Sequence, residues 1–136
     1  MKKLYLLGFV LISSILQAQP FGNEWINYSQ KYYKFSIAED GVYQITFNDL
    51  ANAGIPISGI APENIQLFAA NEEVPIYIEG GEDGFFNSTD FIEFIGRKND
   101  GSLDTPLYDT PDDQPNPFYS LYNDTLSYFL TWNTTG

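Results

Sequence analysis

Apolar and polar residues alternate over several short stretches of this chain, which is the pattern of strands that bury one face. The alternation is clearest over residues 33–37 and 43–47, where aromatic and aliphatic side chains occupy every second position. Glu39-Asp40-Gly41 lies between these stretches and is typical of a tight turn. The sequence therefore predicts an antiparallel hairpin here.

A short helix is predicted directly after this hairpin. Asn48 can cap a helix over Asp49–Ala53, because its side chain can accept a hydrogen bond from the first turn. Asp49 adds negative charge near the N-terminus of the helix, and Gly54 suits a left-handed residue just past its end.

Two more strands are predicted on either side of Asn71-Glu72-Glu73, one over residues 65–69 and the other over residues 74–78. Pro75 cannot donate a hydrogen bond to a neighbouring strand, so it places the second of these strands at a sheet edge or near its own beginning.

The last two strands predicted from the pattern differ in character. Residues 91–95 are apolar on both faces, which predicts a strand buried between two layers, whereas residues 126–132 alternate and predict a closing strand. The sum is a mainly β chain of about six strands and one short helix, which is typical of a small β-sandwich-like domain.

Between these two strands, Arg97 to Pro117 shows little apolar periodicity and contains four prolines. Loops of about 20 residues are uncommon in ordered domains unless they have a function or pack against a neighbour. We therefore expect this loop, or an edge strand, to contact a partner.

The amino terminus has the pattern of an export signal. Lys2 and Lys3 precede a mostly apolar run from Leu4 to Ile15, which is shorter than the about 20 residues that a membrane-spanning helix needs. We expect residues 1–18 to be a signal peptide and residues 19–136 to form one β-rich module without a membrane span. The protein would then reside in the periplasm, at the outer membrane or on the cell surface.

The chain is strongly acidic, with a net charge of −12. After residue 18 only four basic residues stand against 18 acidic ones, so the charge of that part is −14. Such a charge repels nucleic acid and favours basic partners.

The sequence contains no cysteine and no histidine. Disulfides, a Cys-His dyad, a Ser-His-Asp triad and a histidine zinc site are all excluded for this chain. We therefore expect no enzymatic activity from it.

One group of oxygen-bearing side chains invites a metal hypothesis. Asp83, Asn87 and Asp90, with Glu82 beside them, surround a glycine-rich turn and are hard ligands of the kind that calcium prefers. Their spacing differs from that of the EF-hand loop, and the same residues occur in turns for backbone reasons alone. Calcium is the only cofactor that we consider, and the turn interpretation is favoured.

A second hypothesis concerns aromatic residues expected at the surface. Such rings can stack on sugars, although aromatic residues near strand ends also serve in cores and protein interfaces. The residues are Trp25, Tyr28, Tyr32, Phe118, Tyr119 and Tyr122. They support an alternative function as a stand-alone cell-surface module that binds glycan or protein.

Short blocks spread over almost the whole chain after residue 18 resemble, in the same order, the amino-terminal region of one protein family. That family is the PorU-like sortases of the type IX secretion system, which are related to gingipains and belong to peptidase family C25. The most distinctive block is Asp83 to Asn87 with Asp90, Ile92, Glu93, Phe94 and Gly96. The other blocks are Gln19 to Ile26, Gly41 to Tyr43, Ala53 to Ile55, Asn64 to Phe68, Gln114 to Pro117, Ser120 to Asp124 and Tyr128 to Trp132.

The resemblance implies a surface-associated protein of a Bacteroidetes bacterium. In this family a cysteine peptidase domain with a Cys-His dyad follows the resembling region, and the region is a prodomain-like β-sandwich that packs against it. Neither catalytic residue can be carried over to this sequence. The resemblance thus implies a non-catalytic amino-terminal module whose partner is a downstream catalytic domain that this sequence does not include.

Overall fold

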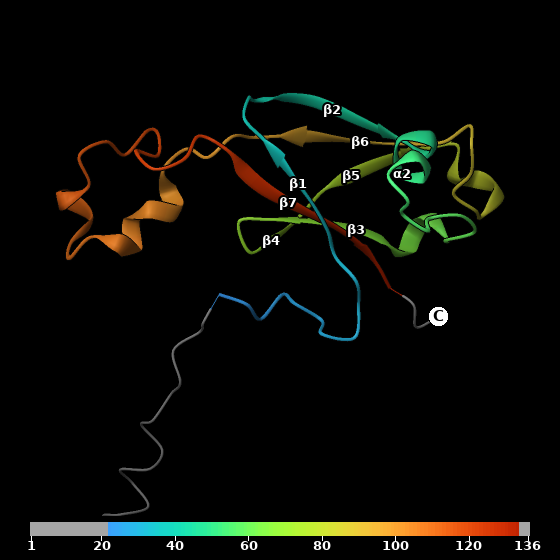
Figure 1. The fold of residues 1–136 in the computed structure, drawn as a ribbon, viewed down its shortest axis with the longest axis horizontal. Coiled ribbons are helices and arrows are strands. Elements are labelled where there is room, and N and C mark those ends of the chain that lie inside the picture. Colours follow the sequence, from blue (N-terminus) through green and yellow to red (C-terminus); the bar gives the residue numbers. More distant parts are fainter. Residues whose placement is uncertain (1–21, 134–136) are drawn as a thin grey trace, which may run out of the picture.

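The computed structural model describes residues 22–133 (Figure 1). Within this range seven strands form two antiparallel sheets that pack face to face, which confirms the mainly β, sandwich-like prediction. Sheet A has the strand order β1-β7-β3-β4, and sheet B has the order β2-β6-β5. The strands of sheet A are β1 (Tyr33–Ile37), β3 (Ile65–Ala69), β4 (Glu72–Val74) and β7 (Leu126–Trp132). Those of sheet B are β2 (Gly41–Thr46), β5 (Ile76–Glu79) and β6 (Phe91–Gly96).

The predicted hairpin over residues 33–47 is wrong, although both of its strands exist. β1 pairs with β7 in sheet A, and β2 pairs with β6 in sheet B. Residues 38–40 therefore carry the chain from one sheet to the other instead of turning within one sheet. Both strands point their alternate apolar side chains into the same core, which is why the pattern alone resembles a hairpin.

The predicted strand over residues 74–78 is divided at Pro75. β4 ends at Val74 and forms a hairpin with β3 through a two-residue turn, in which Ala70 and Asn71 have φ of 49° and 68°. β5 begins at Ile76 and belongs to sheet B. Both are edge strands, so the edge position predicted for Pro75 is confirmed.

Strand β6 is only half buried, which corrects the prediction that residues 91–95 lie between two layers. Ile92 and Phe94 point into the core, but Ile95 is 67% exposed on the opposite face. β6 is the central strand of sheet B, and it holds its neighbours by backbone pairing on both sides. Its outward side chains face away from sheet A.

Helix α2 (Phe47–Asn52) confirms the predicted helix, with a different N-cap. Thr46, not Asn48, caps it: its hydroxyl oxygen accepts a hydrogen bond from the Asp49 N–H at 3.1 Å, and the Asp49 carboxylate accepts from the Thr46 N–H at 2.9 Å. This reciprocal pair is a capping box. Gly54 follows the helix with φ of 75°, as predicted.

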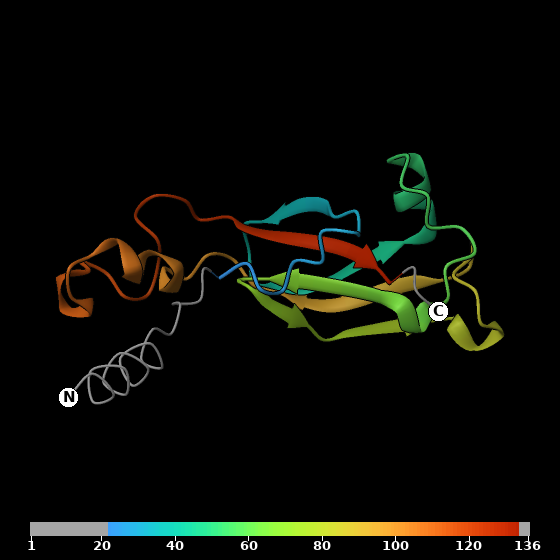
Figure 2. The same ribbon diagram turned by 90° about the horizontal axis from the view of Figure 1, so that it is seen from below.

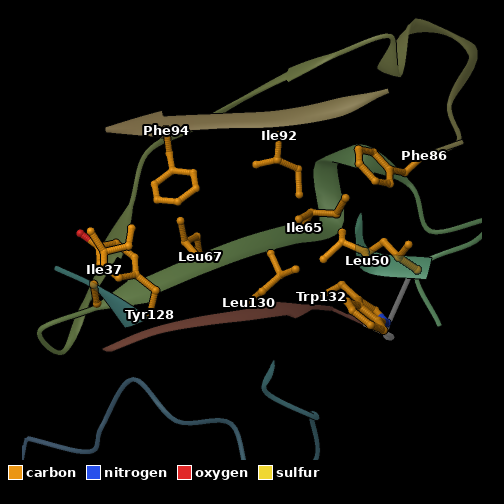
Figure 3. Packing of buried hydrophobic residues seen from close by; sticks show 12 residues of the cluster. Ile37, Leu50, Ile65, Leu67, Phe86, Ile92, Phe94, Tyr128, Leu130 and Trp132 are labelled. Atoms are coloured by element: carbon orange, nitrogen blue, oxygen red, sulfur yellow. The ribbon is translucent and has the colours of Figure 1, made fainter. Parts of the chain in front are cut away.

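The core lies between the two sheets (Figure 3). Ile92 and Phe94 of β6 point toward Leu67 and Leu130 of sheet A. The ring of Tyr128 lies 5.7 Å from that of Phe94, so aromatic contacts join the sheets as well.

The outer faces of the two sheets differ. The outer face of sheet A is covered by the segment before β1, where the Trp25 ring stacks on Phe68 at 5.1 Å and lies 5.3 Å from Phe129. The outer face of sheet B instead exposes Val42, Tyr77 and Ile95. Among the described residues, large apolar side chains are therefore exposed on the outer face of sheet B and not on that of sheet A.

Candidate binding surface: the lobe between β6 and β7

Residues 97–125, which we call the lobe, project from one end of the sandwich (Figures 1 and 2). The lobe contains the 3₁₀ helices η3 (Ser102–Leu107) and η4 (Pro111–Asp113), and none of the seven described strands lies in it. It includes the predicted partner-contacting loop, Arg97 to Pro117, and continues to Thr125. Helix α2 and the turn over residues 80–90 lie at the opposite end of the sandwich.

Asn99 joins the two ends of the lobe. Its side-chain amide donates a hydrogen bond to the Asn123 carbonyl at 2.9 Å, and its backbone N–H donates to the Asp124 carbonyl at 3.1 Å. Its side-chain oxygen accepts from the Gly101 N–H at 3.0 Å. These three bonds close the lobe as a loop with a fixed neck.

Gln114 ties together the middle of the lobe. Its side-chain amide donates to the carbonyls of Gly101 and Asn116 at 2.9 and 3.1 Å, and its side-chain oxygen accepts from the Thr105 hydroxyl at 2.9 Å. Gly101 has φ of 87°, and a Cβ there would lie 2.7 Å from the backbone of Tyr119. The lobe is therefore an ordered element held by local polar contacts, without a strand framework.

The lobe concentrates the exposed apolar side chains of the protein. Of the eleven large apolar side chains that are exposed among residues 22–133, six lie in the lobe: Leu103, Leu107, Phe118, Tyr119, Leu121 and Tyr122. Phe118 is 82% exposed and Tyr122 is 69% exposed. Exposed apolar side chains that gather in one region are common at interaction surfaces, so the lobe is the candidate surface.

The charged residues of the lobe are also almost all of one sign. Residues 99–125 contain six aspartates and no basic residue, and the two cations of the lobe, Arg97 and Lys98, lie at its neck. The hydroxyl of Tyr122 beside Tyr108 raises the pKa of Tyr108, first through a hydrogen bond between their side chains. The aromatic groups thus lie among acidic and hydroxyl groups, a surface that suits a basic partner.

A hollow of about 430 Å³ lies where the lobe meets the sandwich. Val74, Leu126 and Tyr128 of sheet A line it, together with Leu103 of the lobe and Ile95 of sheet B. Charged residues of both signs line it too, among them Glu72, Asp100, Arg97 and Lys98. Its volume falls within the range of about 300 to 1,000 Å³ that is usual for ligand pockets.

The residues of the calcium hypothesis lie together in the turn before β6. The Asn87 amide donates to the Asp83 carboxylate at 3.0 Å, and the Asn87 N–H donates to the Asp90 carboxylate at 2.8 Å. The remaining Asp83 and Asp90 oxygens accept from the Phe85 N–H and the Thr89 hydroxyl. Three of the four carboxylate oxygens therefore each have an N–H donor, and the fourth shares the Thr89 hydroxyl with the Asn87 side-chain oxygen.

No group of three or more histidine, cysteine, aspartate or glutamate side chains with metal-binding geometry occurs among residues 22–133. Asn87 would contribute an amide oxygen, which is not one of these four side-chain types. The calcium site at Asp83, Asn87 and Asp90 stays a prediction, and the hydrogen bonds describe what a bound cation would have to displace.

The aromatic residues expected at the surface divide into two groups. Tyr28, Phe118, Tyr119 and Tyr122 are exposed, whereas Trp25 and Tyr32 pack against Phe68 on the outer face of sheet A. Leu103, Leu107 and Leu121 belong to the lobe surface but were not predicted. The only sequence signal for them is their position in a segment without periodicity.

Comparisons with protein-family models, with curated proteins and with solved structures found no match to this chain. The gingipain-related family therefore stays a resemblance. Residues 1–18, expected to be a signal peptide, lie outside the described residues. Within residues 22–133 the structure contains no helix with the length and hydropathy that a membrane span needs.

Proposed function

We propose that this chain is the non-catalytic amino-terminal module of an exported, gingipain-like cysteine peptidase or type IX secretion sortase. It packs against the catalytic domain of the same protein, or regulates it, through the lobe. The observation that carries the proposal is the lobe itself, an ordered projection that exposes six large apolar side chains among aspartates.

The composition supports a binding role. Thiol chemistry and imidazole-based proton transfer need cysteine and histidine, and this sequence contains neither. The family activity that the resemblance implies would belong to the catalytic domain. The module contributes shape, apolar surface and charge.

The physical chemistry of the lobe favours a basic partner. Exposed tyrosine and phenylalanine rings pack against the aliphatic parts of arginine and lysine side chains. The lobe aspartates attract the guanidinium and ammonium groups of these side chains. Because most of these charges are exposed, salt screens them, and the association should weaken as ionic strength rises.

The test is a titration of the purified protein with a separately expressed gingipain-like catalytic domain at low and high salt. We expect binding at low salt and weaker binding at high salt. Phe118→Ser should reduce the affinity about tenfold or more, since it removes the most exposed large apolar side chain of the lobe. The matched control is Phe85→Ser, which removes a 59% exposed phenylalanine of the turn over residues 80–90 and should leave binding unchanged, because that turn lies at the opposite end of the sandwich. Absence of association at either salt would remove the proposal.

The alternative is a stand-alone surface module that binds glycan or another protein. The exposed rings of Phe118, Tyr119 and Tyr122 favour it, because such rings can stack on sugars. Binding to immobilised glycans that is lost in Tyr122→Ser, together with a stop codon directly after codon 136, would favour this alternative. A reading frame that continues into a region with cysteine and histidine would favour the peptidase module.

A further inference from the structure

The hollow at the base of the lobe connects two exposed apolar surfaces. Leu103 of the lobe and Ile95 of sheet B both line it, and their side chains are 44% and 67% exposed. Ile95 lies directly opposite Val42 in the β2–β6 pairing, and Val42 is 69% exposed. An apolar track therefore runs from the lobe, across the hollow, to the outer face of sheet B.

The floor of the hollow is part of the rigid framework. Val74, Leu126 and Tyr128 belong to β4 and β7, and Tyr128 is 2% exposed in the core. Pro75 also lines the hollow, at the point where the chain leaves sheet A for sheet B. The hollow is present without any partner, so binding there needs little reorganisation.

The charges at the hollow differ from those on either side of it. Arg97 and Lys98 line the hollow beside Glu72, Glu73 and Asp100, so charges of both signs meet there and the formal charge of the lining is only −1. Beyond the hollow, aspartates are the only charged residues of the lobe. The outer face of sheet B has Glu93 on β6 and Glu79 on β5. The acidic groups near that face raise the pKa of Tyr77, first through its hydrogen bond to Glu79 and then through the charges of Glu79, Glu82 and Glu93.

We propose that the hollow is an anchoring site for one large apolar side chain of a cationic, extended segment of a partner. Lysine or arginine residues before and after the anchor would contact the lobe aspartates on one side and Glu93 on the other. A second copy of this chain does not have this chemistry, because two molecules of such negative charge repel each other. The inference deepens the proposed function, on which it rests, by giving the partner a sequence character.

The probe is an acetylated and amidated heptapeptide with a central tryptophan, two lysines on each side and a glycine at each end. Titrated into the ¹⁵N-labelled protein, it should shift the amide resonances of Ile95, Leu103 and Leu126. A peptide with serine in place of the tryptophan should bind about tenfold more weakly, and one with glutamates in place of the lysines should not bind. Absence of binding by the tryptophan peptide, or shifts confined to regions away from the hollow, would overturn the inference.

A matched pair of variants locates the site. Leu103→Ser changes a residue that lines the hollow, and Leu107→Ser changes a residue of the same type in the same 3₁₀ helix that does not. Both side chains are exposed, so both variants should fold. We expect about tenfold weaker peptide binding for Leu103→Ser and unchanged binding for Leu107→Ser. Ile95→Thr, which keeps a β-branched residue in β6, should also weaken binding.

The two proposals fail in different ways. Equal effects of Leu103→Ser and Leu107→Ser would overturn the anchoring site. If the catalytic domain then still binds in a manner sensitive to Phe118→Ser, the proposed function stands without the anchoring site.

Discussion

The hydroxyl of Tyr128 holds both backbone groups of Arg97. It accepts a hydrogen bond from the Arg97 N–H at 2.7 Å and lies 3.2 Å from the Arg97 carbonyl, to which it donates. Tyr128 is buried in β7, and Arg97 is the first residue of the lobe. This pair therefore fastens the neck of the lobe to the core of the sandwich.

We predict that Tyr128→Phe lowers the free energy of unfolding by about 1 to 3 kcal/mol, because it leaves the Arg97 backbone groups without their partner. Urea denaturation measures the loss, and amide exchange at Arg97 should become faster. The control is Tyr43→Phe, which removes an exposed hydroxyl that donates to the Glu39 carbonyl at 2.9 Å. Its loss should be smaller, and an equal loss in both variants would contradict the role given to Tyr128.

The alternating pattern predicted which residues face the core, but not which strands are neighbours. Phe35 of β1 and Tyr43 of β2 both pack against the core as predicted, yet their strands lie in different sheets. A period of two specifies the face of a strand, whereas the pairing of β1 with β7 joins residues almost 100 positions apart. The hairpin error follows from this difference.

The structure of the lobe could be predicted only in part from the sequence. Its lack of periodicity correctly marked residues 97–117 as irregular, but its order depends on Asn99 and Gln114, whose side chains bond to backbone groups up to 24 residues away. The hollow is lined by Pro75, where one strand of the sequence pattern becomes two strands in different sheets. Neither the long-range hydrogen bonds of the lobe nor the hollow can be predicted from the local sequence.

The capping box of α2 predicts a pH dependence of stability. The hydrogen bonds from the Thr46 hydroxyl and from the Thr46 N–H hold the pKa of Asp49 below its ordinary value of 3.8. A carboxyl group with a lowered folded-state pKa stabilises the fold fully above its unfolded-state pKa. That stabilisation is lost as the pH falls through the folded-state pKa. The contribution of Asp49 should therefore be present near neutral pH and should disappear below 3.8.

Thr46→Val tests this prediction, because valine has nearly the same shape and lacks the hydroxyl. The variant should be less stable than the wild type near neutral pH, and the difference should shrink in strongly acidic solution. Thr46→Ser keeps a hydroxyl and should behave like the wild type. Chemical denaturation at several pH values gives the comparison. A difference between Thr46→Val and the wild type that does not change with pH would count against the assignment.

The calcium hypothesis makes a prediction about melting temperature. Because three of the four carboxylate oxygens of Asp83 and Asp90 accept from N–H groups and the fourth shares the Thr89 hydroxyl with Asn87, we expect the same melting temperature with excess calcium and with a chelator. A melting temperature that rises with calcium concentration would contradict this expectation and support a site, since a ligand of the folded state stabilises it by mass action. Loss of such a rise in Asp83→Asn would locate the site.

The contact between Gly80 and Asp90 predicts a large difference between two glycine substitutions in the same turn. Both Gly80 and Gly84 have positive φ, at 87° and 83°, so alanine at either position is strained by about 1 to 2 kcal/mol. A Cβ at Gly80 would also overlap the Asp90 carboxylate and lie 2.8 Å from its Cγ, whereas a Cβ at Gly84 would have no atom within 4 Å.

Asp90 cannot move aside easily, because it is 2% exposed and accepts hydrogen bonds from the Asn87 N–H and the Thr89 hydroxyl. Overpacking of this kind typically adds about 1 to 3 kcal/mol. We therefore predict that Gly80→Ala lowers the free energy of unfolding by that much more than Gly84→Ala does, as measured by urea denaturation. Equal losses would mean that the turn relaxes around the new methyl group, and that the buried Asp90 carboxylate does not fix the backbone at Gly80.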